Sequence, residues 1–212
     1  MKKYNIFAIL VLMVMPLCFM ACSESEDTVE EFPDWKNRNE AYFDNIYEKA
    51  MGIEDGSWKI IRKYSLEDTI PAGYTDYIVV EVLDEGTGSG CPMFTDSVLV
   101  NYRGRLLPST SYPEGYVFDQ SYTGDYNPET AMPSKLYVGS LIDGFTTALQ
   151  YMHIGDRWRV YIPYQMGYGT SATTSIPAYS TLIFDIALVA YYRPGVSPDP
   201  LSQVITGTTR MV

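Results

Sequence analysis

The sequence is poor in the side chains on which most hydrolases and metalloenzymes depend. Its 212 residues contain one histidine and three cysteines. Cys18 and Cys22 lie near the start of the chain, and Cys91 stands alone further on. This spacing supports neither a disulfide framework nor a cysteine-rich metal site. We therefore interpret Cys91 as an incidental free thiol and His153 as a solvated turn residue rather than a catalytic one.

Positive charge is also scarce. The chain has 15 Lys and Arg against 26 Asp and Glu, which gives a formal net charge of −11. An excess of this sign repels the phosphates of nucleic acids and the surface of an anionic bilayer. We therefore predict that the chain has no nucleic-acid partner.

What the sequence does contain favours a globular domain rich in β-sheet. Hydrophobic residues make up 46% of the chain, which is enough to build a core. Tyr, Val, Ile and Thr are abundant and suit strands, while frequent Gly and Pro mark turns. At this length the chain has room for one domain of ordinary size with appendages.

The first apolar run indicates export. Two lysines precede residues 6–21. This apolar stretch is short for a membrane-spanning helix and ends in a small residue, Ala21. We therefore predict a signal peptide at residues 1–21. Cys22 follows in a pattern that resembles a bacterial lipobox, although Phe19 stands where Leu is usual. Cys22 is the predicted lipidation site and membrane anchor, and a signal peptide cut nearby, or a plain anchor, is the alternative.

An acidic, polar run follows Cys22. Residues 23–27 read Ser-Glu-Ser-Glu-Asp, a composition that suits a solvated tether. The run is also similar to the acidic signal that directs some Bacteroidetes lipoproteins to the outer face of the outer membrane. A simple linker explains the same residues. The predicted location is therefore the cell envelope, in the outer membrane, with its periplasmic or surface face left open.

Hydrophobic periodicity predicts a series of strands and two helices. Strands are expected at 58–64, at 77–83, at 97–106, in a segment ending at Pro163, and at 181–188. Helices are expected at 34–51 and 136–152. Asp34 is the candidate N-cap of the first helix, and Gly52 is its stop. The apolar face of this helix is expected to pack against the main domain, with a dimer contact as the alternative.

The most informative stretch is residues 152–189, which predicts two strands joined by a loop with apolar and aromatic tips. Pro163 ends the first strand because it has no N–H to donate. Gly167 and Gly169 permit a turn that presents Tyr168, and Ile176-Pro177 forms a second rigid corner.

Several short motifs occur in a characteristic order. They are Tyr102-Arg103-Gly104, Phe118-Asp119, Leu141-Ile142-Asp143-Gly144-Phe145, Tyr168-Gly169, Ile176-Pro177 and Phe184-Asp185. In order and spacing they resemble the FKBP family of peptidyl-prolyl isomerases. The resemblance covers residues 74–191. There the loop Leu107–Tyr116 is longer than is usual in the family, and it is expected either to cover the site or to contact a partner.

The resemblance implies an α+β fold, an FKBP-like half-open antiparallel β-sheet wrapped around one short α-helix, with an N-terminal helical extension. The predicted parts are the signal peptide (1–21), an acidic tether (22–34), an extension of one helix and one strand (35–73), the isomerase domain (74–191) and a C-terminal tail (192–212).

The implied activity is cis-trans isomerisation of Xaa-Pro segments in exported or envelope proteins, without a cofactor or a metal. C–N resonance opposes rotation of a peptide bond with a barrier of about 18–20 kcal/mol. Lowering that barrier requires a site complementary to the twisted amide rather than a nucleophile or a proton shuttle. The scarcity of conventional catalytic groups is therefore compatible with this chemistry.

By resemblance, an apolar cup surrounds the prolyl bond. The implied site residues are Tyr102, Phe118, Asp119, Leu141, Ile142, Phe145, Tyr168, Ile176 and Phe184. Tyr168 and the Ile142 backbone amide are the implied hydrogen-bond donors, and Asp119 is expected to orient aromatic hydroxyls. Taken singly, each aromatic residue is more commonly explained by core packing.

The chain also departs from the family pattern. Phe145 stands where Trp is usual, Met132 falls near the position of an aromatic wall residue, and Ser175 near that of an aliphatic one. These changes favour the alternative of a non-catalytic FKBP-fold binding module, or chaperone, that grips proline-containing or apolar segments. A surface adhesin is a third hypothesis, which rests only on the acidic run at residues 23–27.

Overall fold

The computed structural model describes residues 30–195. Every element described below belongs to the unit Glu31–Val212, the second unit of the chain. The predicted signal peptide, the lipidation site at Cys22, most of the acidic tether and the tail beyond residue 195 lie outside the described residues.

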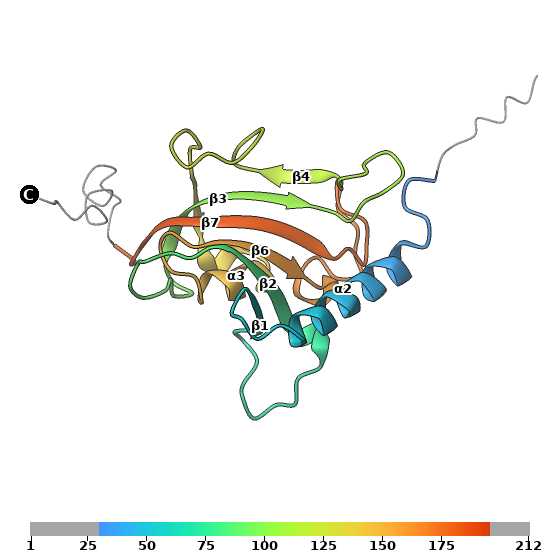
Figure 1. The fold of residues 1–212 in the computed structure, drawn as a ribbon, viewed down its shortest axis with the longest axis horizontal. Coiled ribbons are helices and arrows are strands. Elements are labelled where there is room, and N and C mark those ends of the chain that lie inside the picture. Colours follow the sequence, from blue (N-terminus) through green and yellow to red (C-terminus); the bar gives the residue numbers. More distant parts are fainter. Residues whose placement is uncertain (1–29, 196–212) are drawn as a thin grey trace, which may run out of the picture. The chain divides into compact units, whose positions relative to one another are not determined.

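A seven-stranded antiparallel sheet lies at the centre of the second unit (Figure 1). Its order is β1-β2-β6-β7-β3-β4, and β5 also pairs with β3. The strands are β1 Trp58–Arg62, β2 Tyr77–Asp84, β3 Ser97–Arg105, β4 Val117–Gln120, β5 Ser134–Tyr137, β6 Arg157–Ile162 and β7 Leu182–Tyr192. The α-helices in the described part are α2, Trp35–Met51, and α3, Asp143–Leu149, and the 3₁₀ helices are η1 Tyr74–Asp76, η2 Val138–Ser140 and η3 Tyr164–Met166. The predicted open antiparallel sheet with a short helix is confirmed.

The two faces of the sheet are covered by different helices. Successive side chains of a strand point to opposite faces. On one side, the inner face, Phe184 of β7 contacts Phe145 of α3, with ring centroids 5.1 Å apart. Tyr161 of β6 pairs with Ile183 and therefore points to the other side, the outer face, where it lies 6.3 Å from Tyr42 of α2. Because both faces are covered, β7 is buried along nearly its whole length.

The central helix is shorter than the predicted 136–152. Leu136 and Tyr137 belong to β5, where they pair with Val98 and Ser97 of β3. Helical periodicity cannot distinguish these residues from the start of a helix, whereas pairing with β3 satisfies their backbone groups in an extended conformation. The apolar stripe expected on the helix is present in α3, whose residues 144–149 are all buried.

The first predicted helix is confirmed as α2, with Asp34 at the N-cap position as predicted but without a capping hydrogen bond from its side chain. Asp34 has a φ of 49° in the left-handed region and makes no side-chain cap to the helix N–H groups. Its carboxylate instead accepts a hydrogen bond of 2.6 Å from the side chain of Asn37. Gly52 follows the last turn as expected, and its N–H donates to the Lys49 carbonyl at 3.2 Å. The helix packs on the sheet, as predicted from its apolar face.

The predicted strands differ from the observed ones mainly at their ends. β1 stops at Arg62, two residues before the expected end, and β7 continues to Tyr192, beyond the predicted 188. β2 and β3 lie within one residue of their predicted bounds. Among residues 30–195, none of the helices combines the length and apolar character that crossing a bilayer would need.

Candidate functional site

Four aromatic rings from separate elements meet on the inner face, and we call them the aromatic cluster. They are Tyr102 of β3, Phe118 of β4, Phe145 of α3 and Phe184 of β7. Phe184 lies at the centre, with edge-to-face contacts of 5.4 Å to Phe118 and 5.1 Å to Phe145. Tyr102 contacts Phe145 edge-to-face at 5.9 Å. Edge-to-face geometry suits the ring quadrupoles, so these contacts hold the rings in defined orientations.

A glycine makes this convergence possible. Gly104 follows Tyr102 by two residues and lies on the same face of β3. A Cβ at this position would lie 2.5 Å from Cε1 of Phe184 and 2.6 Å from Cζ of Phe118. Atoms cannot approach so closely, so any larger residue would force both rings to move. The glycine of the Tyr102-Arg103-Gly104 motif is therefore required by the packing of the aromatic cluster.

A carboxylate borders the aromatic cluster and orients Tyr102. The Tyr102 hydroxyl donates a hydrogen bond of 2.9 Å to Oδ2 of Asp119, whose side chain is exposed. Burial, followed by this hydrogen bond, raises the pKa of Tyr102 to about 12. The hydroxyl therefore stays protonated at any physiological pH, and Asp119 keeps it pointing in one direction.

Tyr168 stands beside the same carboxylate, on a turn that its flanking glycines shape. The N–H groups of Gly167 and Gly169 both donate to the Tyr164 carbonyl, at 3.0 and 2.8 Å, and Gly169 has a φ of +67° that favours glycine. Tyr168 is 42% exposed. Burial, and then the nearby charge of Asp119, raise the pKa of Tyr168. Its hydroxyl is thus a protonated donor that solvent or a ligand can reach.

The aliphatic site residues lie in the same hydrophobic cluster. Leu141 and Ile142 are partly buried against the core, and Ile176 is buried within it. The N–H of Ile176 donates to Oγ1 of Thr173 at 3.0 Å, which fixes the corner before Pro177. Ile142 precedes α3, and its N–H donates to no acceptor within residues 30–195. A backbone donor is therefore free at the first turn of the helix.

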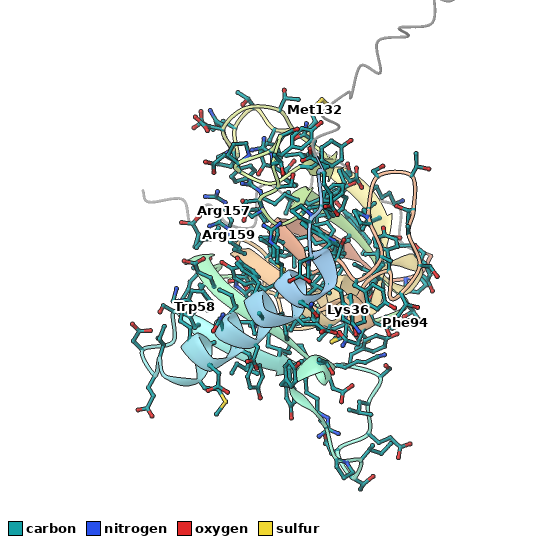
Figure 2. All side chains as sticks on the ribbon, turned by 90° about the vertical axis from the view of Figure 1, so that its right-hand side faces the viewer. Lys36, Trp58, Phe94, Met132, Arg157 and Arg159 are labelled. Carbon is teal, nitrogen blue, oxygen red and sulfur yellow. The ribbon has the colours of Figure 1, made fainter. Side chains whose placement is uncertain are left out.

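Two positions at which the resemblance expects wall residues carry exposed side chains. Met132 is 82% exposed, and Figure 2 shows it at the outer edge of the molecule, far from α2. Ser175 is also exposed. Neither side chain is among the residues that pack in or against the hydrophobic core of residues 30–195.

Phe184 and Asp185 are neighbours in β7 and therefore point to opposite faces of the sheet. Phe184 enters the aromatic cluster, whereas Asp185 points to the outer face. There Asp185 accepts hydrogen bonds of 2.7 and 3.2 Å from Arg159. Figure 2 shows Arg159 on the same side as Trp58 and α2. The aspartate of this motif is thus a structural ion-pair partner rather than part of the cluster.

Sequence reasoning missed a contact between Cys91 and His153. They are far apart in the chain, yet Sγ of Cys91 lies 3.9 Å from Nε2 of His153. On its other side His153 has Nδ1 3.7 Å from Asp156, whose carboxylate also accepts the His153 backbone N–H. Burial, and then the charge of Asp156, raise the pKa of the Cys91 thiol. A raised pKa disfavours the nucleophilic thiolate, so this arrangement does not make Cys91 a reactive group.

A small cavity lies away from the aromatic cluster, between α2 and the sheet. Its volume is about 10 Å³, and it is lined by Asn39, Glu40, Phe43, Tyr74, Thr75, Pro163, Tyr164, Gln165 and Thr181. That is room for about one water molecule. The cavity is therefore too small for a peptide.

Comparisons with known proteins find similarity to one family and to several of its relatives. Residues 89–189 match the family described as FKBP-type peptidyl-prolyl cis-trans isomerase. A relative from Trypanosoma cruzi, the macrophage infectivity potentiator, is 31% identical over 191 residues, covering 90% of this chain and 86% of the relative. The outer membrane protein MIP of Legionella longbeachae is 34% identical over 52% of this chain and 42% of its own length.

The fold comparison agrees with these matches. The crystal structure of FkpA from Escherichia coli superposes with a TM-score of 0.53 at 26% identity, over 74% of this chain and 61% of that one. Apart from the Trypanosoma cruzi relative, this chain therefore spans less than two thirds of the length of these proteins.

Proposed function

The chain belongs to the FKBP-type peptidyl-prolyl cis-trans isomerase family, and from this premise we propose that it isomerises Xaa-Pro bonds at the aromatic cluster. The observation that carries the proposal is the convergence of four rings from β3, β4, α3 and β7 on one site. Asp119 and Tyr168 lie near Tyr102, and Leu141, Ile142 and Ile176 belong to the same hydrophobic core as the rings. The clients we propose are exported or envelope proteins, whose folding prolyl isomerisation can limit.

The chemistry requires little beyond binding. A prolyl bond must lose its C–N resonance to rotate, and the twisted amide carries less charge separation than the planar one. An aromatic surface therefore favours the twisted form over the planar form more than water does. In this proposal the proline ring lies against Phe145 and Phe184, and no covalent intermediate forms.

Two donors are available to hold the substrate. Tyr168 presents a protonated hydroxyl beside Asp119, and the Ile142 N–H is free at the start of α3. Hydrogen bonds to the carbonyls next to proline would hold one side of the bond while the other rotates. Asp119 acts indirectly in this scheme because it orients the Tyr102 hydroxyl.

The test is NMR exchange between cis and trans forms of short Xaa-Pro peptides with the purified chain, while the residue before proline is varied. We expect acceleration by the wild-type chain. Tyr168→Phe is expected to lower it about tenfold, the equivalent of one hydrogen bond made only in the transition state. A wild-type chain that leaves the exchange rate unchanged would disprove the catalytic proposal.

A binding module without catalysis is the second candidate. The exposed Met132 and Ser175 favour it, because they leave the twisted amide less enclosed. The same titration separates the two. Peptide signals that shift without faster exchange would indicate binding alone, and Asp119→Ala would then change affinity but no rate.

We also propose that the chain is held in the envelope by lipid on Cys22. The support is the lipobox-like sequence and acidic tether, together with a relative whose name places it in an outer membrane. Mass spectrometry of the mature protein should detect an acylated N-terminal cysteine. Cys22→Ser should release the chain from the membrane fraction, and unchanged membrane association would refute the anchor.

A further inference from the structure

The helix α2 contacts the loop between β6 and β7, which contains both Tyr168 and Ile176. In Figure 1 the first turns of α2 lie beside the loops at that end of the sheet. α2 precedes residues 89–189, the segment that matches the family. Its contacts to the loop are therefore additional to the part of the chain that the family match covers.

Asn39 connects α2 to the end of this loop. Its side chain is fully buried, at 0% exposure, on a helix whose other buried residues are apolar or aromatic. Oδ1 of Asn39 accepts the N–H of Thr181 at 2.7 Å, and the Asn39 carbonyl accepts the Thr181 hydroxyl at 3.2 Å. The amide Nδ2 donates to the Trp35 carbonyl at 2.7 Å. A buried amide satisfied on both sides holds its partner in one position.

Trp35 reaches further, to the corner that carries Ile176. Its indole N–H donates to Oγ of Ser180 at 2.9 Å, and the Ser180 hydroxyl donates to the Pro177 carbonyl at 2.7 Å. These two bonds form a relay from the first turn of α2 to the residue that follows Ile176. Ile176 is itself buried, so a shift of the corner would move a side chain of the proposed site.

A second set of contacts reaches the turn that presents Tyr168. Tyr179 has a φ of 63°, a strained value for a residue with a side chain, and its N–H donates to the Gly169 carbonyl at 3.0 Å. The Tyr179 ring packs edge-to-face on Tyr164 at 5.2 Å, and Lys36 of α2, labelled in Figure 2, lies 5.0 Å above it. The Tyr164 hydroxyl donates to Glu40 of α2 at 3.1 Å. Strain of this kind persists only where surrounding contacts hold it in place.

We propose that α2 holds the loop of the proposed site in place, a role that we call the brace. In this role Trp35 and Asn39 are positioning residues that fix Tyr168 and Ile176. This inference rests on the proposed isomerase function for its catalytic consequence. Its structural content, the ordering of residues 164–181 by α2, stands independently. Neither positioning residue touches the substrate.

The experiment compares variants that remove single hydrogen bonds of the relay. Trp35→Phe keeps an aromatic ring but loses the indole N–H, and Ser180→Ala interrupts the same relay from the loop side. Tyr42→Phe is the matched control, because Tyr42 lies on α2 but packs on Tyr161 of the sheet. Amide hydrogen exchange of Gly169 and Tyr179 reports the order of the loop without any substrate. Isomerisation of an Xaa-Pro peptide reports its catalytic consequence.

We expect amide exchange at Gly169 and Tyr179 to be about tenfold faster in both relay variants, while amides of the β6–β7 pairing keep their wild-type rates. We expect kcat/KM to fall about fivefold, and the preference for the residue before proline to change, because a misplaced wall alters the fit. The double variant should show less than the sum of the two effects, since both break one relay.

The outcomes separate the two proposals. If the amides of Gly169 and Tyr179 exchange in both relay variants at the rates seen in Tyr42→Phe, the brace is overturned, whatever the activity. Loop exchange that rises in a chain without any isomerase activity would retain the brace and refute the proposed function. Faster exchange throughout the sheet would mean global destabilisation instead, and would also overturn the brace.

Discussion

The inner and outer faces of the sheet carry similar side chains, which differ in their charged partners and in how far other residues cover them. On the inner face, the Tyr102 hydroxyl donates to an exposed carboxylate, Asp119, at 2.9 Å. On the outer face, the Tyr161 hydroxyl donates to Glu81 at 3.3 Å, and Glu81 also lies 3.8 Å from Arg159. Each face thus pairs a tyrosine with a carboxylate, yet only the outer carboxylate also has an arginine partner there.

The surroundings of the two tyrosines explain the difference. Tyr161 is stacked on Trp58, with centroids 5.8 Å apart, and α2 covers it through Tyr42. The rings that join Tyr102 in the aromatic cluster come from three elements, β4, α3 and β7, and are bordered by the exposed residues Asp119 and Tyr168. Residue type alone therefore does not identify a site. What distinguishes the inner face is that Asp119 and Tyr168 stay exposed and Tyr102 and Phe118 only partly buried, above the buried rings of Phe145 and Phe184.

The largest expected effect comes from closing the space between the inner rings. In Gly104→Ala the new methyl group would overlap Phe184 and Phe118. We expect the free energy of unfolding to fall by about 1–3 kcal/mol and kcat/KM by about a hundredfold. Chemical denaturation and peptide exchange measure the two. Gly52→Ala is the control, since its φ is −86° and its nearest contact 3.6 Å. Near-normal activity in Gly104→Ala would contradict the role given to the aromatic cluster.

A change on the outer face should separate stability from activity. Arg159→Ala removes the two hydrogen bonds to Asp185, which is only 7% exposed. The free energy of unfolding should fall by about 2 kcal/mol, because Asp185 loses both hydrogen bonds and keeps only Arg105, 3.7 Å away. Activity per folded molecule should stay within about twofold, because the pair lies behind the sheet.

The matched control for that variant is Arg157→Ala. Arg157 lies 3.6 Å from Asp84, and the Asp84 side chain is largely exposed. A loss of less than about 1 kcal/mol is expected for such a surface pair. A loss of activity in Arg159→Ala as deep as that in Gly104→Ala would remove the proposed distinction between the faces.

Removing one hydroxyl from each face gives a smaller and more direct comparison. Tyr102→Phe frees Asp119 and should lower kcat/KM about fivefold, the equivalent of about 1 kcal/mol. Tyr161→Phe should leave kcat/KM unchanged and cost only about 1 kcal/mol of stability. Steady-state kinetics and denaturation of the two proteins provide the measurement. Equal kinetic losses would mean that the Tyr102 hydroxyl has no special role.

The smallest effect is expected from pH. The pKa of Tyr102 is raised to about 12 in the folded chain, above the ordinary value of about 10. A group with a raised folded-state pKa stabilises the fold fully below its unfolded pKa. This contribution should be complete below about pH 10 and be lost as the pH rises to about 12.

Activity should accordingly be flat between about pH 6 and 9, the range in which a general base would titrate. The measurements are denaturation midpoints up to about pH 11 and kcat/KM across the flat range. Tyr102→Phe is the comparison variant, and its alkaline loss of stability should be smaller by the Tyr102 contribution. A bell-shaped profile centred near neutrality would contradict the proposed mechanism.

Much of the fold could be predicted because β-strand periodicity is local. The alternation of Val98, Val100 and Tyr102 marks β3 to within one residue of its observed end, and Pro163 ends β6 because its ring removes a backbone donor. The error at β5 has the opposite cause. Leu136 and Tyr137 are compatible with helix and strand alike, and pairing with β3 decides between them.

The site was less predictable than the fold. The motif order marked Tyr102, Phe118, Phe145 and Phe184 by resemblance, and the structure places their rings in contact. Nothing in the local sequence around Cys91 indicates its contact with His153, because the two residues approach only when distant loops meet. The capping role expected of Asp34 also failed, since the chain enters α2 with a left-handed φ.

The sequence by itself determined five of the strands, β1, β2, β3, β6 and β7, the turn glycines Gly167 and Gly169, and that no conventional nucleophilic machinery is concentrated in one motif. These are properties of neighbouring residues, which hydrophobic period and backbone freedom specify. Only the tertiary structure decided that Asn39 and Trp35 of α2 contact Thr181 and Ser180, about 140 residues away along the chain. Such contacts depend on how elements pack, and a buried hydrogen bond leaves no periodic trace in the sequence.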